Sequence, residues 1–129
     1  MRAARAEVDL GAVAHNVGVL RALVAPSLVC AVVKADGYGH GAIAVSEAAL
    51  DAGADWLAVA LIEEAAVLRK AGITAPILLL SQPRLGDLTA VVRYDLRVCI
   101  TSPVNSLSPG NSGRYGDPTR PLAKMRCFG

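Results

Sequence analysis

The chain has 129 residues, of which 53% are hydrophobic and 19% are charged, a balance typical of one globular domain rather than of a disordered chain. Its formal net charge of +2 is too small to suggest a nucleic acid or an anionic membrane as a partner, and no apolar run approaches the ~18 residues of a membrane span. Its three cysteines share no metal-ligand spacing, so we expect a reduced, cytoplasmic protein without a metal site.

The first expected elements are a short strand over Ala6–Leu10 and a helix that follows it. Asp9 suits the N-cap of this helix, because its carboxylate can accept from the unpaired N–H groups of the first turn. Apolar residues then recur at spacings of four, three and four, which predicts one buried helix face: Val13, Val17, Leu20 and Val24. Pro26 ends the helix.

The next strand, Leu28–Val33, is a continuous apolar run and is expected to be buried on both faces. Lys34 follows at its C-terminal end, which is where α/β folds place their chemistry. Glycines then recur at every second position and allow the backbone to approach a ligand closely before a helix begins near Ala42: Gly37, Gly39 and Gly41. A lysine, a tyrosine, a histidine and a helix N-terminus therefore converge on one small region.

Strands and helices continue to alternate after this point. The pattern predicts strands over about 56–60, 77–80 and 97–100, and helices over about 42–52, 62–71 and 85–92. Glu63 and Glu64 open one of these helices, where carboxylates complement the helix dipole; adjacent helix positions point about 100° apart, which argues against an acid/base pair. The alternation indicates parallel strands with right-handed crossovers, either a piece of a (β/α) barrel or a doubly wound sheet.

The composition changes after Thr101. The last 28 residues contain four Pro, four Gly and four Ser and show neither helical nor strand periodicity. A closed barrel usually needs about 250 residues. We therefore expect residues 1–101 to form a partial (β/α) TIM-type barrel of about four βα units, and residues 102–129 to be an irregular or disordered tail.

Three interpretations of Lys34 compete on the residues alone. In the first, it is a solvated lysine at a strand end, and the glycines only turn the chain. In the second, residues 39–44 form a dinucleotide fingerprint, G-x-G-x-x-A, although the five residues from Lys34 to Tyr38 separate it from the strand that it should follow directly. In the third, Lys34 is the nucleophilic amine of a pyridoxal phosphate site.

The run from Val32 to Gly41, V-V-K-A-D-G-Y-G-H-G, resembles the pyridoxal phosphate attachment motif of bacterial alanine racemases. The flanking segments 6–10, 52–60 and 75–80 also resemble this family, as do His15-Asn16 and Glu63-Glu64-Ala65, so the resemblance covers about residues 5–101. Other pyridoxal phosphate barrels, the cofactor-homeostasis proteins and the basic amino-acid decarboxylases, also put the lysine at the end of the first strand. The Tyr-Gly-His-Gly run favours the racemase.

The resemblance implies an N-terminal (β/α) barrel followed by a β-rich domain, a homodimer, and interconversion of L- and D-alanine for cell-wall peptidoglycan. It implies that Lys34 holds pyridoxal 5'-phosphate as a Schiff base and moves the α-proton on one face of the substrate. Tyr38 would donate a hydrogen bond to the cofactor phosphate. Leu80 would pack near the cofactor ring or serve as an ordinary core leucine, and His40 would order the loop without a catalytic role.

Residues 102–129 depart from the family pattern. They lack the later barrel strands, the arginine that pairs with the pyridine nitrogen and the tyrosine that acts as the second acid/base. We therefore expect a truncated or frameshifted racemase product with little or no activity. The alternatives are a non-catalytic nucleotide-binding α/β module and a barrel remnant without function.

Overall fold

The computed structural model describes residues 4–99 and 125–128. Its helices and strands follow one another in this order: α1 (Leu10–Val24), β1 (Leu28–Val32), α2 (Lys34–Tyr38), α3 (Ala42–Asp51), β2 (Trp56–Val59), α4 (Ile62–Lys70), β3 (Ile77–Leu79), the 3₁₀ turn η1 (Leu85–Asp87), α5 (Leu88–Arg93), β4 (Leu96–Val98) and β5 (Met125–Phe128). Within the described ranges, no helix has the length and apolar character needed to cross a membrane.

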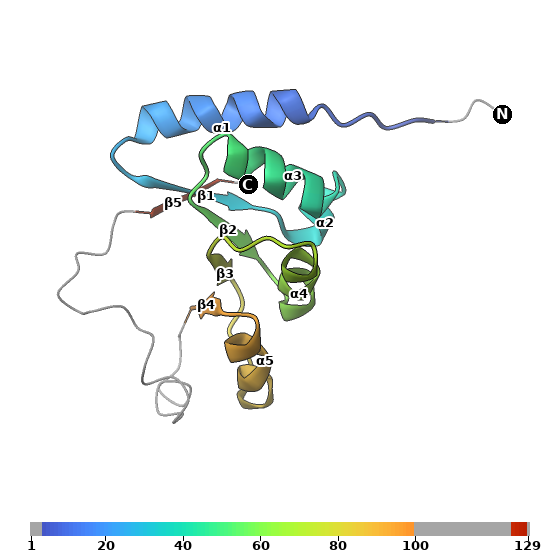
Figure 1. Ribbon diagram of the computed structural model, residues 1–129, viewed down its shortest axis with the longest axis vertical. Helices are drawn as coiled ribbons and strands as arrows, with labels where there is room; N and C mark the ends of the chain where they lie inside the picture. Colours follow the sequence, from blue (N-terminus) through green and yellow to red (C-terminus); the bar gives the residue numbers. More distant parts are fainter. Residues whose placement is uncertain (1–3, 100–124, 129) are drawn as a thin grey trace.

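The strands form one parallel sheet in the order β4-β3-β2-β1-β5 (Figure 1). From β1 to β4 each strand pairs with the one that follows it in the chain, and helices connect them. This is the predicted α/β arrangement of parallel strands with crossover helices. The carboxyl ends of β1, β2 and β3 therefore lie along one edge of the sheet.

The main core lies between the sheet and the helices. Odd-numbered strand residues such as Val33, Leu57 and Ile77 pack with Leu68 of α4 and Val91 of α5. A smaller cluster joins α1 and α3 to the start of the sheet through Val17, Val29, Ala49 and Ala54. Because side chains alternate along a strand, the even-numbered residues of β1, β2 and β3 face the opposite side of the sheet, whereas in β4 it is the even-numbered Leu96 that packs in this core.

Most of the predicted boundaries agree with the structure to within a few residues, and Asp9 is confirmed as the N-cap of α1. Its Oδ1 accepts a hydrogen bond from Ala12 N at 3.1 Å. The strand expected over residues 6–10 is wrong. Residues 4–9 run out from the body of the molecule with exposed side chains and pair with no strand (Figure 1), so the backbone has no partner for a ladder.

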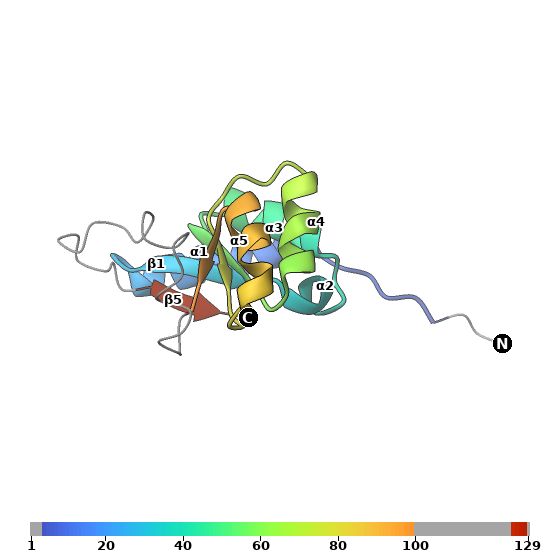
Figure 2. The ribbon, with the colours of Figure 1, turned by 90° about the horizontal axis from the view of Figure 1, so that it is seen from below.

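The predicted irregular tail, residues 102–129, lies outside the described residues except at 125–128. There the structure differs from the expectation, because β5 pairs in parallel with β1, from Leu28 opposite Met125 to Ala31 opposite Phe128. Figure 2 shows β5 and β1 side by side. A strand of four residues is too short to reveal a periodicity after a segment rich in Pro and Gly. Its consequence is that β1 is paired along both of its edges.

Candidate functional site

Lys34 lies at the carboxyl end of β1, one residue beyond the last bond of the ladder. Val33 N donates to Ala58 O at 2.8 Å, and Leu80 N donates to Val59 O at 2.8 Å. Continuing the register of β1, β2 and β3 places Lys34, Ala60 and Leu80 at one level of three neighbouring strands. Leu80 is 39% exposed, which fits a site at this edge better than a core position.

The residues after Lys34 form a turn of left-handed helix. Ala35, Asp36 and Tyr38 have φ angles of 52°, 55° and 57°, and the glycines among them, Gly37 and Gly39, have 63° and 82°. This conformation costs a residue with a Cβ about 1–2 kcal/mol. Gly37 and Gly39 have no Cβ and adopt these angles without that cost. Such strain persists where the surroundings hold it, and it clusters at functional sites.

Hydrogen bonds within the turn and to α3 hold this conformation. Gly37 N donates to Val33 O at 3.0 Å, and Gly41 N donates to Asp36 O at 2.9 Å. The Asp36 side chain accepts from Ala42 N, the first residue of α3, at 2.8 Å. Asp36 thus caps a helix whose own N-cap residue, Gly41, has no side chain. The Asp36 side chain therefore joins the left-handed turn directly to the start of α3.

The Glu64 carboxylate ties the same turn to the end of β2. Its Oε1 accepts from Ala35 N at 2.7 Å, and its Oε2 accepts from Ala60 N at 2.9 Å and from Leu61 N at 3.0 Å. Sequence reasoning assigned Glu64 only to the helix dipole and missed this contact. Its third position in α4 predicts a bond back to Leu61, but nothing in the pattern indicates a bond to Ala35, 29 residues earlier.

The two residues predicted to form the site, Lys34 and Tyr38, lie close together. Lys34 Nζ is 6.0 Å from the centroid of the Tyr38 ring, at the outer limit of a cation–π contact. Tyr38 is half exposed, so its hydroxyl can donate to a ligand. His40 Nδ1 lies 3.0 Å from Gly37 O, which agrees with the expected role of His40 in ordering the loop.

A largely apolar cavity of about 460 Å³ lies on the helix side of β1. Val17 and Leu20 of α1 line it, together with Val45 and Ala49 of α3 and the ring of Tyr38. Lys34 does not line it. The cavity therefore adjoins the site at Tyr38 but does not include the amine of Lys34.

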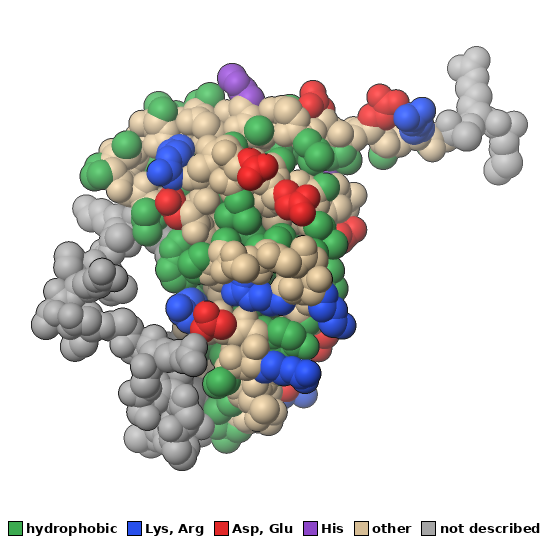
Figure 3. Space-filling model, in the orientation of Figure 1, with side chains coloured by type: hydrophobic (Ala, Val, Ile, Leu, Met, Phe, Trp, Pro, Cys, Tyr) green, Lys and Arg blue, Asp and Glu red, His purple; other side chains and the backbone are tan. Residues whose placement is uncertain are grey.

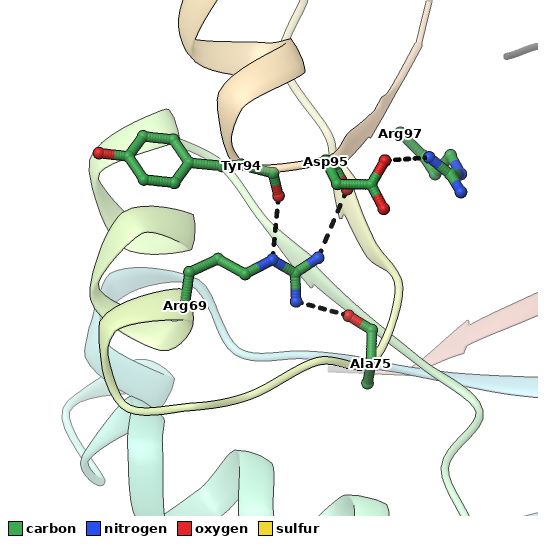
Figure 4. Close-up of polar contacts among 5 residues, drawn as sticks. All are labelled: Arg69, Ala75, Tyr94, Asp95 and Arg97. Carbon is green, nitrogen blue, oxygen red and sulfur yellow. Dashed lines mark hydrogen bonds and ion pairs between the residues drawn. The ribbon is translucent and has the colours of Figure 1, made fainter.

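At the amino ends of the strands, side chains of Arg69 and Asp55 make hydrogen bonds that join neighbouring segments. Arg69 Nε donates to Tyr94 O at 2.9 Å, and its Nη1 donates to Ala75 O at 2.8 Å (Figure 4). Burial lowers the pKa of the Arg69 guanidinium below its usual range, and the nearby carboxylate of Asp95 partly opposes this shift. Asp55 accepts from Val29 N at 2.9 Å. In folds with parallel strands and crossover helices, chemistry gathers at the carboxyl ends of the strands and stabilising contacts at the other end.

Figure 3 shows acidic and basic side chains interspersed over the visible face rather than gathered in one basic patch. Among the residues that the structure describes, no group of three or more His, Cys, Asp or Glu side chains is placed to hold a metal ion.

Comparison with known proteins gives consistent matches. The family model of the alanine racemase N-terminal domain matches residues 8–107, slightly past the end of the resemblance seen in the sequence. The alanine racemase of Symbiobacterium thermophilum is 50% identical over 100 residues, which are 78% of this chain and 26% of that protein. The alanine racemase of Mycolicibacterium smegmatis is 48% identical over 102 residues, 79% of this chain and 26% of that protein.

Solved structures agree with these relatives. The alanine racemase of Corynebacterium glutamicum matches with a TM-score of 0.72 and 34% identity, over 78% of this chain and 29% of that one. The enzyme of Streptomyces lavendulae matches with a TM-score of 0.70 and 41% identity, over 74% and 25%. The predicted fold class, a partial (β/α) TIM-type barrel, is confirmed. The chain spans about a quarter of the length of the relatives that it matches.

Proposed function

The chain belongs to the alanine racemase family through that family's N-terminal domain, and from this premise we propose that it supplies the lysine-bearing part of an enzyme that interconverts L-alanine and D-alanine. The observation that carries the proposal is the position of Lys34. It stands at the carboxyl end of β1, on a strained turn that Asp36 and Glu64 hold in place. A solvated lysine in an ordinary turn would not require a strained backbone held by two carboxylate side chains.

Pyridoxal 5'-phosphate fits the residues at this edge. Lys34 offers a primary amine as the attachment point, and the Tyr38 phenol, whose ring centroid is 6.0 Å from that amine, can donate to a phosphate oxygen. Leu80 presents an exposed apolar side chain at the same level of the sheet. The cofactor, when bound, supplies a conjugated ring that stabilises negative charge on the substrate α-carbon.

The proposed catalytic work of Lys34 is proton transfer. Its Nζ takes the α-proton from one face of the substrate and can return a proton to that face. Inversion also needs a proton donor on the opposite face, since addition to a single face regenerates the starting enantiomer. We place that donor outside residues 4–99, and the homodimer that the resemblance implies offers a second subunit as its source. The product, D-alanine, would serve peptidoglycan synthesis in the cytoplasm.

The geometry argues against the dinucleotide alternative. A pyrophosphate would need free backbone N–H groups in the glycine run. Gly39 N instead donates to Ala35 O at 2.9 Å, and Gly41 N donates to Asp36 O at 2.9 Å. The internal bonds of the left-handed turn therefore occupy the donors that the fingerprint would offer.

The test is to add pyridoxal 5'-phosphate to the 129-residue chain and to reduce the mixture with borohydride. We expect absorbance near ~420 nm before reduction and, by peptide mass spectrometry, a phosphopyridoxyl group on Lys34. Lys70, exposed in the last turn of α4, is the internal reference for nonspecific labelling. The K34R variant should lose the absorbance. Equal labelling of Lys34 and Lys70, or labelling elsewhere, would contradict the proposal.

A further inference from the structure

The two oxygens of Glu64 have different partners. Oε2 accepts from Ala60 N and Leu61 N, which lie four and three residues away and belong to the start of its own helix. Oε1 accepts from Ala35 N at 2.7 Å, across 29 residues of sequence. The two bonds to Oε2 form a local helix cap, which the helix dipole favours. The bond to Oε1 is a tertiary contact with Ala35, the residue that follows Lys34.

The contact with Ala35 falls where the backbone leaves the sheet. The last ladder bond of this segment is Val33 N to Ala58 O, and the left-handed turn begins at Ala35 with a φ of 52°. The Ala35 N–H belongs to the peptide group that joins Lys34 to Ala35. A bond to a carboxylate is stronger than one to a neutral acceptor, so it can hold a strained peptide in a single orientation.

We infer that Glu64 is a positioning residue for Lys34. By fixing the Lys34–Ala35 peptide, it sets the direction in which the Lys34 side chain leaves the backbone, and it couples the end of β1 to the end of β2. This inference deepens the proposed function, since it assigns a residue that orients the cofactor lysine. The contact itself can be measured without cofactor, which keeps the two claims separable.

Two substitutions break this contact in different ways. In E64Q the side chain keeps its length but has only one acceptor oxygen, and the local cap competes for that oxygen. In E64D the charge remains, but the shorter side chain cannot reach Ala35 N and the nearby N–H groups of Ala60 and Leu61 at the same time. Glu63 is exposed on the same helical turn, so E63Q is the matched control for the loss of one carboxylate from the start of α4.

The first measurement is amide hydrogen exchange by NMR on the full chain without cofactor. We expect the Ala35 amide to exchange about tenfold faster in E64Q and in E64D than in the unsubstituted chain and in E63Q. A tenfold change corresponds to about 1.4 kcal/mol, close to the lower end of the range for a hydrogen bond to a charged group. Ala60 and Leu61 should keep most of their protection. Unchanged exchange at Ala35 in both variants would overturn the inference.

The second measurement tests positioning rather than structure alone. Trace labelling with acetic anhydride, read as the ratio of Lys34 to Lys70 acetylation, should change at least threefold in E64Q and E64D and stay constant in E63Q. Circular dichroism checks that each variant is folded, and E64D carries the test if E64Q does not fold. Faster exchange at Ala35 with an unchanged ratio would refute the positioning role. A failure of pyridoxal 5'-phosphate to label Lys34 of the unsubstituted chain would refute the proposed function and leave both measurements valid.

Discussion

Asp36 Oδ1 accepts a hydrogen bond of 2.8 Å from the backbone N–H of Ala42, so a residue in the left-handed turn is also the cap of helix α3. Asp36 has a φ of 55°, a conformation that Asp and Asn tolerate better than other residues with a Cβ. The same side chain therefore serves the turn and the helix. This dual role makes its substitution informative.

Asp36→Ala should lower the free energy of unfolding by about 1–3 kcal/mol, because it removes the cap and leaves a residue that adopts a positive φ less readily. Asp36→Asn keeps a carbonyl oxygen and the conformational preference, so its effect should stay below about 1 kcal/mol. Urea unfolding followed by circular dichroism measures both. Equal losses in the two variants would show that the carboxylate charge, and not the cap, matters.

Alanine substitutions at Gly37 and Gly39 distinguish the effect of steric crowding from the effect of backbone strain. A Cβ at Gly37 would lie 3.3 Å from Ala42 Cα and Ala42 N, whereas a Cβ at Gly39 would meet nothing within 4 Å. Both positions have a positive φ, so both alanine variants carry the strain of about 1 kcal/mol. We expect Gly37→Ala to destabilise the chain by about 1–2 kcal/mol more than Gly39→Ala, since the backbone of α3 must shift. Thermal unfolding compares the two, and equal melting temperatures would contradict the crowding.

Arg69 should be the most sensitive of the basic residues in α4. Its guanidinium donates to Ile73 O, Ala75 O and Tyr94 O at 2.7, 2.8 and 2.9 Å, which joins the loop after α4 to the end of α5. Arg69→Met keeps the aliphatic stem but leaves these acceptors without their donor, at a cost of about 2–4 kcal/mol. Lys70→Met, at the exposed neighbouring position, is the control and should change stability by less than about 0.5 kcal/mol. Comparable losses in both variants would argue against the role of these bonds.

Sequence reasoning found the elements because they carry local signals. The run before Lys34 is continuously apolar, and Val17 and Leu20 follow helical spacing; the structure confirms the elements that these two patterns predict. The missed features are tertiary. No local rule indicates that Glu64 reaches Ala35, because the contact depends on two strand ends meeting at one edge of the sheet. The segment 6–10 shows the reverse case, in which strand-like residues find no neighbour to pair with.

Tyr38 offers a direct test of how the proposed site holds its cofactor. Its ring is half exposed, and its hydroxyl is the group that we expect to donate to the phosphate, so Tyr38→Phe should leave the stability of the cofactor-free chain nearly unchanged. Loss of one hydrogen bond to a charged group should weaken pyridoxal 5'-phosphate binding by about 10- to 100-fold. Pyridoxal, which lacks the phosphate, should bind the variant and the unsubstituted chain equally well. Absorbance titrations with both compounds measure this difference. If Tyr38→Phe weakened pyridoxal as much as the phosphate ester, the tyrosine would act on the ring or on Lys34 instead of on the phosphate.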